Sequence, residues 1–119
     1  MAERIPPEIQ QYLLKYQQLQ AQLNQILTEK AVLQQELREI ERALNVLKDV
    51  PDDAEVFRSS GHVMVRVSKS DAVRELNDRK ELIDLRIKTI ERQESLLRQQ
   101  LAEVQSRLSQ YASILQKKQ

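Results

Sequence analysis

The side chains of this sequence that could do chemistry are carboxylates, lysines, arginines, serines and one histidine. The chain has no cysteine, which excludes disulfides and thiolate metal sites. His62, the only histidine, is alone in a predicted turn, and the sequence indicates no nucleophile–base pair. One glycine is too few for a glycine-rich phosphate loop, and no cluster of metal ligands stands out. We therefore expect no enzyme activity, no cofactor and no metal site.

The charged residues are balanced and interleaved. The chain has 19 basic and 18 acidic residues, a net charge of +1. Binding to nucleic acid or to an anionic membrane needs clustered positive charge, so we expect neither partner. No run of about 18 apolar residues could span a membrane. Residues 1–7 lack the apolar core of a signal peptide, so we expect a cytoplasmic protein.

Two long stretches, residues 8–48 and 71–117, are predicted to be helices. Apolar residues recur in each at spacings of three and four, from Ile9 to Leu47 and from Val73 to Leu115. Such a long, narrow stripe is typical of a coiled coil, because a globular helix has a wider apolar face over fewer turns. The polar interruptions of the two stripes are Lys30, Lys80 and Glu94.

The ends of these helices carry recognisable signals. Pro51 ends the first helix, because the residue before a proline is disfavoured in the α region. Ser68 or Ser70 can cap the second helix, and Asp71 suits the positive end of its dipole.

The segment between the helices, residues 54–68, is predicted to be a β-hairpin. Valines at 63, 65 and 67 alternate with Met64 and Arg66, the period of a strand. Ser60 and Gly61 are expected to supply the turn, since glycine tolerates a positive φ. The residues expected to mediate assembly are Val56, Phe57, Gly61, Val63, Met64, Val65 and Val67.

These elements predict a mainly α fold, an antiparallel two-helix coiled coil with a central β-hairpin, in a single domain over residues 1–119. Folding back at the hairpin pairs residues whose numbers add to about 120. Leu23 then meets Leu97, and Tyr12 meets Leu108. A register shifted by one heptad satisfies the same pattern.

A monomer of this kind would be marginally stable. A fully buried large side chain contributes about 1.5–3 kcal/mol, and a single seam buries only one narrow stripe of them. Ordering the backbone costs roughly 1–2 kcal/mol per residue. An isolated hairpin is also marginal in water and leaves its edges unpaired. We therefore expect an obligate oligomer assembled through residues 54–68.

Apolar residues gather where the chain ends meet at the free end of the folded-back helices. Exposed apolar side chains there could bind apolar surfaces of other proteins. These expected binding residues are Ile5, Ile9, Leu13, Leu14, Tyr111, Ile114 and Leu115. Leucines away from the seam also occur in mid-helix, at positions 27, 82 and 85. The residues alone therefore leave open a structural coiled-coil adaptor or scaffold, although a continuous rod has no use for the central hairpin.

Two segments carry a resemblance to a known family. The central sequence AEVFRSSGHVMVRV, residues 54–67, and IKTIERQE, residues 87–94, resemble the archaeal prefoldins, in particular their β-type subunits. The resemblance extends over nearly the whole chain and departs from the family pattern at His62. A single hairpin matches the β-type, because the α-type has two.

The resemblance implies an ATP-independent chaperone, a holdase. Two α-type and four β-type subunits would form a hexamer in which the hairpins join as an intersubunit β-barrel. The distal coiled-coil tips would capture unfolded client proteins and deliver them to a group II chaperonin. On this chain the tips would lie near residues 5–16 and 108–117.

Overall fold

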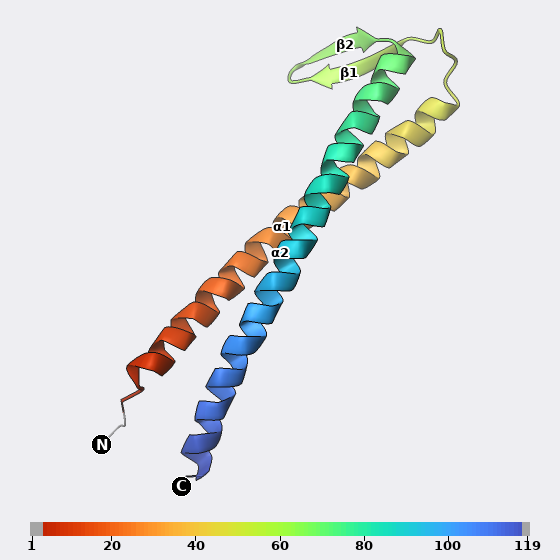
Figure 1. The fold of residues 1–119 in the computed structure, drawn as a ribbon. Coiled ribbons are helices and arrows are strands. Elements are labelled where there is room, and N and C mark those ends of the chain that lie inside the picture. The colour runs from red at the N-terminus through yellow and green to blue at the C-terminus, as the bar shows by residue number, and fades with distance from the viewer. Residues whose placement is uncertain (1–3, 118–119) are drawn as a thin grey trace. The chain divides into compact units, whose positions relative to one another are not determined.

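The computed structural model describes residues 4–117, so both ends of the domain predicted over 1–119 lie outside the described residues. The order of elements is α1 (Pro7–Lys48), β1 (Val56–Ser60), β2 (Val63–Val67) and α2 (Lys69–Lys117) (Figure 1). The predicted fold of two long helices around a central antiparallel hairpin is confirmed. The chain divides into a terminal unit, residues 1–29 with 89–119, and a hairpin unit, residues 30–88.

The terminal unit is held together by apolar side chains from both helices. Here α1 begins and α2 ends at the same end of the unit, so the two segments run antiparallel (Figure 1). The buried cluster consists of Leu19, Leu23, Leu101 and Val104, against which Tyr12, Tyr16, Ile26, Leu27, Leu97 and Leu108 pack. Of the expected pairs Leu23–Leu97 and Tyr12–Leu108, Leu23 belongs to this cluster and the other three residues pack against it.

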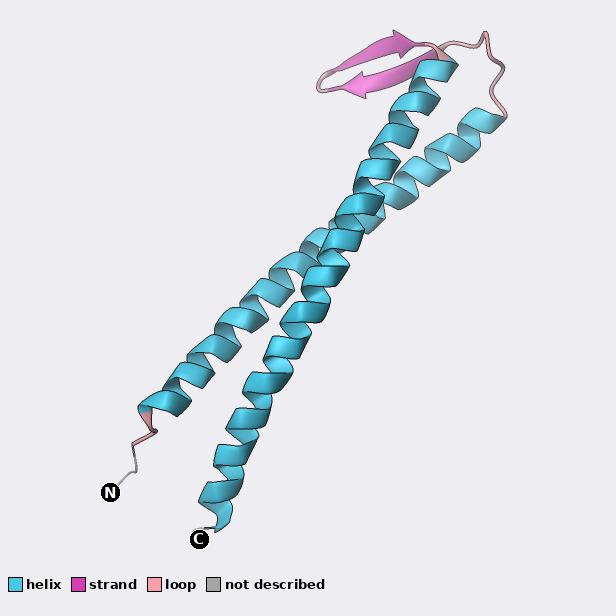
Figure 2. Cartoon of the chain, in the orientation of Figure 1, coloured by secondary structure: helices cyan, strands magenta, loops and turns pink. Residues whose placement is uncertain are grey.

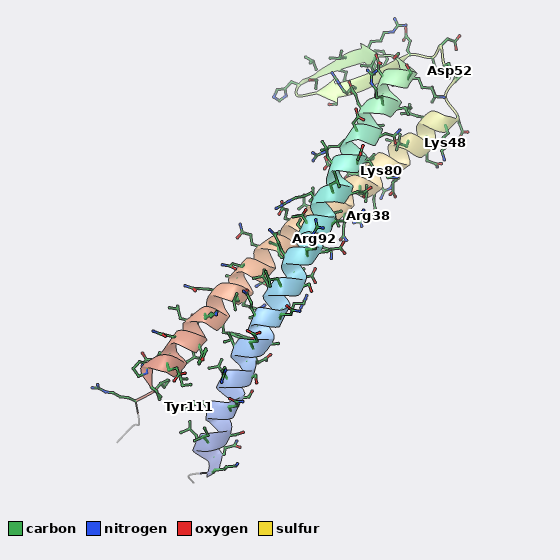
Figure 3. The ribbon with its side chains drawn as sticks, in the orientation of Figure 1. Arg38, Lys48, Asp52, Lys80, Arg92 and Tyr111 are labelled. Atoms are coloured by element: carbon green, nitrogen blue, oxygen red, sulfur yellow. The ribbon has the colours of Figure 1, made fainter. Side chains whose placement is uncertain are left out.

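In the hairpin unit, α1 ends shortly before Pro51. Two backbone hydrogen bonds between residues three apart close its last turn. In one of them Val50 N donates to the Leu47 carbonyl at 3.2 Å. Lys69 Nζ donates to the Val50 carbonyl at 2.7 Å and lies 3.5 Å from the Asp52 carboxylate. Figure 3 labels Asp52 in the connection that follows α1. The start of α2 is thereby tied to the end of α1.

The hairpin turn lies one residue later than predicted. Ser60 is the last residue of β1 and pairs with Val63, so Gly61 and His62 form the turn. Gly61 has a φ of +62°, and within residues 4–117 no other residue type has a positive φ. Positive φ at the first turn residue alone is typical of a type II′ hairpin, in which glycine is favoured at that place. The predicted role of Gly61 is therefore right, and that of Ser60 is wrong.

The start of α2 is capped by Ser68. Asp71 N donates to Ser68 Oγ at 3.1 Å, and Ala72 N donates to the Ser68 carbonyl at 3.0 Å. Ser70 lies inside the helix, which begins at Lys69. Of the two serines that could cap this helix, the structure therefore selects Ser68.

Ion pairs between α1 and α2 add to the packing of the hairpin unit. The Arg79 guanidinium donates to both carboxylate oxygens of Glu36, at 3.1 and 2.8 Å, and this hydrogen bond raises the pKa of Arg79. Lys80 Nζ lies 4.0 Å from Glu41 Oε1. A two-pronged pair favours one longitudinal alignment of the helices more than a single contact would.

Within residues 4–117, no helix combines the length and hydrophobicity needed to cross a membrane.

Candidate interaction surfaces

The hairpin has two faces of different composition, because directly opposed residues of an antiparallel pair share a face. The valine face carries Val56, Arg58, Ser60, Val63, Val65 and Val67. The opposite face carries Phe57, Ser59, Met64 and Arg66. Predicted assembly residues thus lie on both faces.

One contact anchors the valine face to its own helix. Arg58 Nη1 lies 2.6 Å from Glu75 Oε1 on α2, beside which the hairpin lies (Figure 2). Toward the base of the hairpin, Val56 and Val67 are half-buried. Toward the turn, Val63 is 60% exposed and Met64 69% exposed. The apolar side chains farthest from α2 therefore have the least cover within this chain.

The edges of the hairpin carry backbone groups without a partner strand. Ser60 and Val63 flank a two-residue turn and form a hydrogen-bonded pair, so the pairs Ser59–Met64 and Phe57–Arg66 are non-hydrogen-bonded. The N–H and C=O groups of these four residues therefore point outward. Within residues 4–117, no further backbone hydrogen bond reaches them. Both edges could accept another strand.

An apolar groove of about 550 Å³ lies at the base of the hairpin, where β1 meets both helices. Its lining comes from α1, β1 and α2: Ala43, Val46, Leu47, Val56, Phe57, Arg58, Ala72, Glu75 and Leu76. Leu47 and Leu76 lie on the predicted helix seams, and the sequence pattern does not predict this groove. No local pattern indicates it, because its walls come from segments distant in sequence.

The residues predicted for client binding all belong to the terminal unit, where Figure 3 labels Tyr111 near the end of α2. The exposed ones are Ile5, Leu13, Leu14 and Ile114, and the half-buried ones are Ile9, Tyr111 and Leu115. Leu14 is 57% exposed and Ile114 is 52% exposed. Ile5 precedes α1, and its carbonyl accepts a hydrogen bond of 2.9 Å from Gln10 Nε2, which ties this segment to the first turn. These side chains leave an apolar surface for a partner.

His62 is exposed in the hairpin turn. Within residues 4–117, no three acidic or histidine side chains gather where they could hold a metal ion.

A family model and several known proteins match this chain. The family model described as "Prefoldin subunit" matches residues 10–113. A protein of Saccharolobus islandicus named "Prefoldin subunit beta" is 43% identical over 113 residues, 95% of this chain and 90% of that protein. A protein of the same name from Sulfurisphaera tokodaii is 46% identical over 110 residues, 92% of this chain and 88% of that protein.

Solved structures agree with these sequence matches. The crystal structure of the prefoldin beta subunit from Thermococcus strain KS-1 superposes with a TM-score of 0.81 at 33% identity, covering 92% of this chain and 96% of that one. The prefoldin beta2 subunit of the same strain has a TM-score of 0.69 at 19% identity, covering 76% of this chain and 97% of that one, and shares the fold.

Proposed function

Because this chain belongs to the prefoldin family, a family of chaperones rather than enzymes, we propose that it is a subunit of an ATP-independent holdase. It captures unfolded polypeptides on the apolar end of the terminal unit and delivers them to a group II chaperonin in the cytoplasm. Its activity needs no cofactor, because capture on an apolar surface involves no chemical step.

The chain works as part of a hexamer. Prefoldin subunits form complexes with one another, and we propose four copies of this chain with two α-type subunits, joined through their hairpins as an intersubunit β-barrel. Two properties of the hairpin in the single chain support this arrangement. Val63 and Met64 are exposed and both edges carry unpaired backbone groups, so neighbouring strands would bury apolar area and satisfy those groups together.

Client capture rests on one observation, the exposure of apolar side chains at the end of the terminal unit. Unfolded polypeptides expose apolar side chains that folded proteins bury, so an apolar surface selects for the unfolded state. Leu14 and Ile114 are the most exposed large apolar side chains of the predicted set. An apolar surface of this kind does not discriminate between client sequences, which suits a general holdase.

The experiment compares two matched double variants of the full chain, assembled with its partner subunits. L14S/I114S removes apolar area at the end of the terminal unit. V32S/L82S removes similar area from the hairpin unit, where Val32 is 64% exposed and Leu82 is 60% exposed. Each complex is assayed for suppressing aggregation of a chemically denatured protein, and its mass is measured. We expect L14S/I114S to need about fivefold more complex for half suppression, and V32S/L82S to match the wild type.

Deleting residues 1–16 and 108–119 is the stronger form of the test. The shortened chain should assemble with the same number of subunits as the wild type and lose aggregation suppression. Full suppression by the shortened complex would remove these residues from client capture. If the wild-type complex assembles but suppresses no aggregation, the protein is a structural adaptor. A particle containing two copies of this chain alone would contradict the hexamer.

A further inference from the structure

A groove of about 690 Å³ runs along the terminal unit, between the first turns of α1 and the later part of α2. It lies beside the exposed apolar residues but is a different surface. The lining residues are Tyr12, Lys15, Glu103, Val104, Ser106, Arg107 and Gln110. Val104 belongs to the buried cluster and Tyr12 packs against it, so both give the groove an apolar floor. The remaining walls are polar.

The polar side chains of this groove have no partners in the described part of the chain. Between residues 4 and 117, no hydrogen bond or ion pair engages the side chain of Lys15, Glu103 or Arg107. The same holds for the Tyr12 hydroxyl and the Gln110 amide. Intramolecular pairing therefore leaves these donors and acceptors available to a ligand.

The net charge around the groove is positive, although the whole chain has nearly equal numbers of basic and acidic residues. Lys15 and Arg107 outnumber the one carboxylate of the lining, that of Glu103. With the groove residues included, residues 4–16 and 103–117 together hold four basic and two acidic residues, whereas the whole chain has 19 basic and 18 acidic. A local excess of positive charge attracts acidic ligands and raises their association rate.

We propose that this groove binds an extended segment of an unfolded polypeptide in which an acidic side chain adjoins an apolar one. The apolar side chain packs on Tyr12 and Val104, and the carboxylate is held by Lys15 and Arg107. The hydroxyl of Tyr12 and the amide of Gln110 hydrogen bond to backbone groups that a folded client would keep paired. This inference rests on the proposed holdase function and adds a charge preference to it.

The test measures binding of two labelled peptides to the complex by fluorescence anisotropy. The peptides share their apolar residues and length, and differ in carrying three glutamates or three lysines. We expect the acidic peptide to bind about fivefold more tightly at low salt, the effect of two exposed ion pairs. The preference should fall toward unity at about 0.5 M salt, where exposed charges are screened.

Three variants test whether the preference for the acidic peptide arises in the groove. K15Q/R107Q should abolish it, and E103Q should increase it. R42Q/K88Q is the matched control, since it removes two exposed cations of the hairpin unit that have no ion pair within residues 4–117. It should leave the preference unchanged. Equal binding of both peptides by the wild type, or an unchanged preference in K15Q/R107Q, would overturn the inference.

A second assay measures how well the complex suppresses aggregation of a client without acidic residues. It distinguishes failure of this inference from failure of the proposed function. A wild-type complex that suppresses such aggregation but shows no peptide preference is a holdase without the charge-selective groove. A complex that neither suppresses aggregation nor binds either peptide contradicts both proposals.

Discussion

Replacing Ser59 by proline tests whether the outer edge of β1 joins this chain to its neighbours. Because Ser60 and Val63 form a hydrogen-bonded pair, the N–H of Ser59 points away from β2. Proline has no N–H, and it is tolerated on an edge strand when the missing donor would face outward. S59P therefore blocks strand addition at this edge without removing a hydrogen bond from the hairpin.

The expected loss of association free energy follows from the backbone N–H and C=O groups on this edge. Phe57 and Ser59 each present one N–H and one C=O to a neighbouring strand. At about 0.5–1.5 kcal/mol net for each bond, a complete edge contributes about 2–6 kcal/mol. Proline removes one bond and its ring separates the strands, so we expect a loss of about 2 kcal/mol at each joint. That loss weakens association about thirtyfold.

The assay pairs native mass spectrometry of the assembled complex with amide exchange in the isolated chain. S59P should fail to assemble at concentrations where the wild type is complete, while the exchange of the inward-facing Val63 and Val65 amides is unchanged. S60P is the matched control, because it removes an inward donor and should speed exchange at Val63. S59A keeps the backbone N–H and should assemble normally. Normal assembly of S59P would show that the β1 edge takes no part in subunit contacts.

Three further predictions concern interactions within one chain and are measured on the assembled complex. I90A removes a side chain with no exposed surface and should lower the free energy of unfolding by about 2–4 kcal/mol, whereas L96A, at a position 55% exposed, should cost less than about 1 kcal/mol in the same urea titration. S68A should cost about 1 kcal/mol by removing the cap of α2, and S68T should restore most of it; equal stability of all three would contradict the capping role. E36Q should lower the melting temperature slightly by weakening the pair with Arg79, and the difference should disappear at about 0.5 M salt if it is electrostatic.

The buried positions could be predicted from the sequence because heptad spacing is a local property. Every buried apolar side chain within residues 4–117 lies on one of the two predicted seams. These residues are Leu19, Leu23, Ile40, Ile83, Ile90, Leu101 and Val104. An α-helix makes one turn in about 3.6 residues, so apolar residues at spacings of three and four lie on one face. This identifies the buried face without knowledge of the partner helix.

The turn position could not be predicted in the same way. Moving the turn from Ser60–Gly61 to Gly61–His62 shifts the strand pairing by two residues, which leaves every side chain on the same face. The alternation of valines therefore fits both registers equally. The choice of Ser68 over Ser70 as helix cap was open for a similar reason, since both side chains can accept the bond.

The sequence by itself determined two long helices, a central hairpin and the buried seams, because spacing and residue type are read along the chain. Only the tertiary structure brought Lys15 and Arg107 into the lining of one groove, and Val46 and Phe57 into the lining of the other. The residues of each groove come from distant segments, and no periodicity relates them. Only the fold also showed which charges pair within the chain and which remain available to a partner.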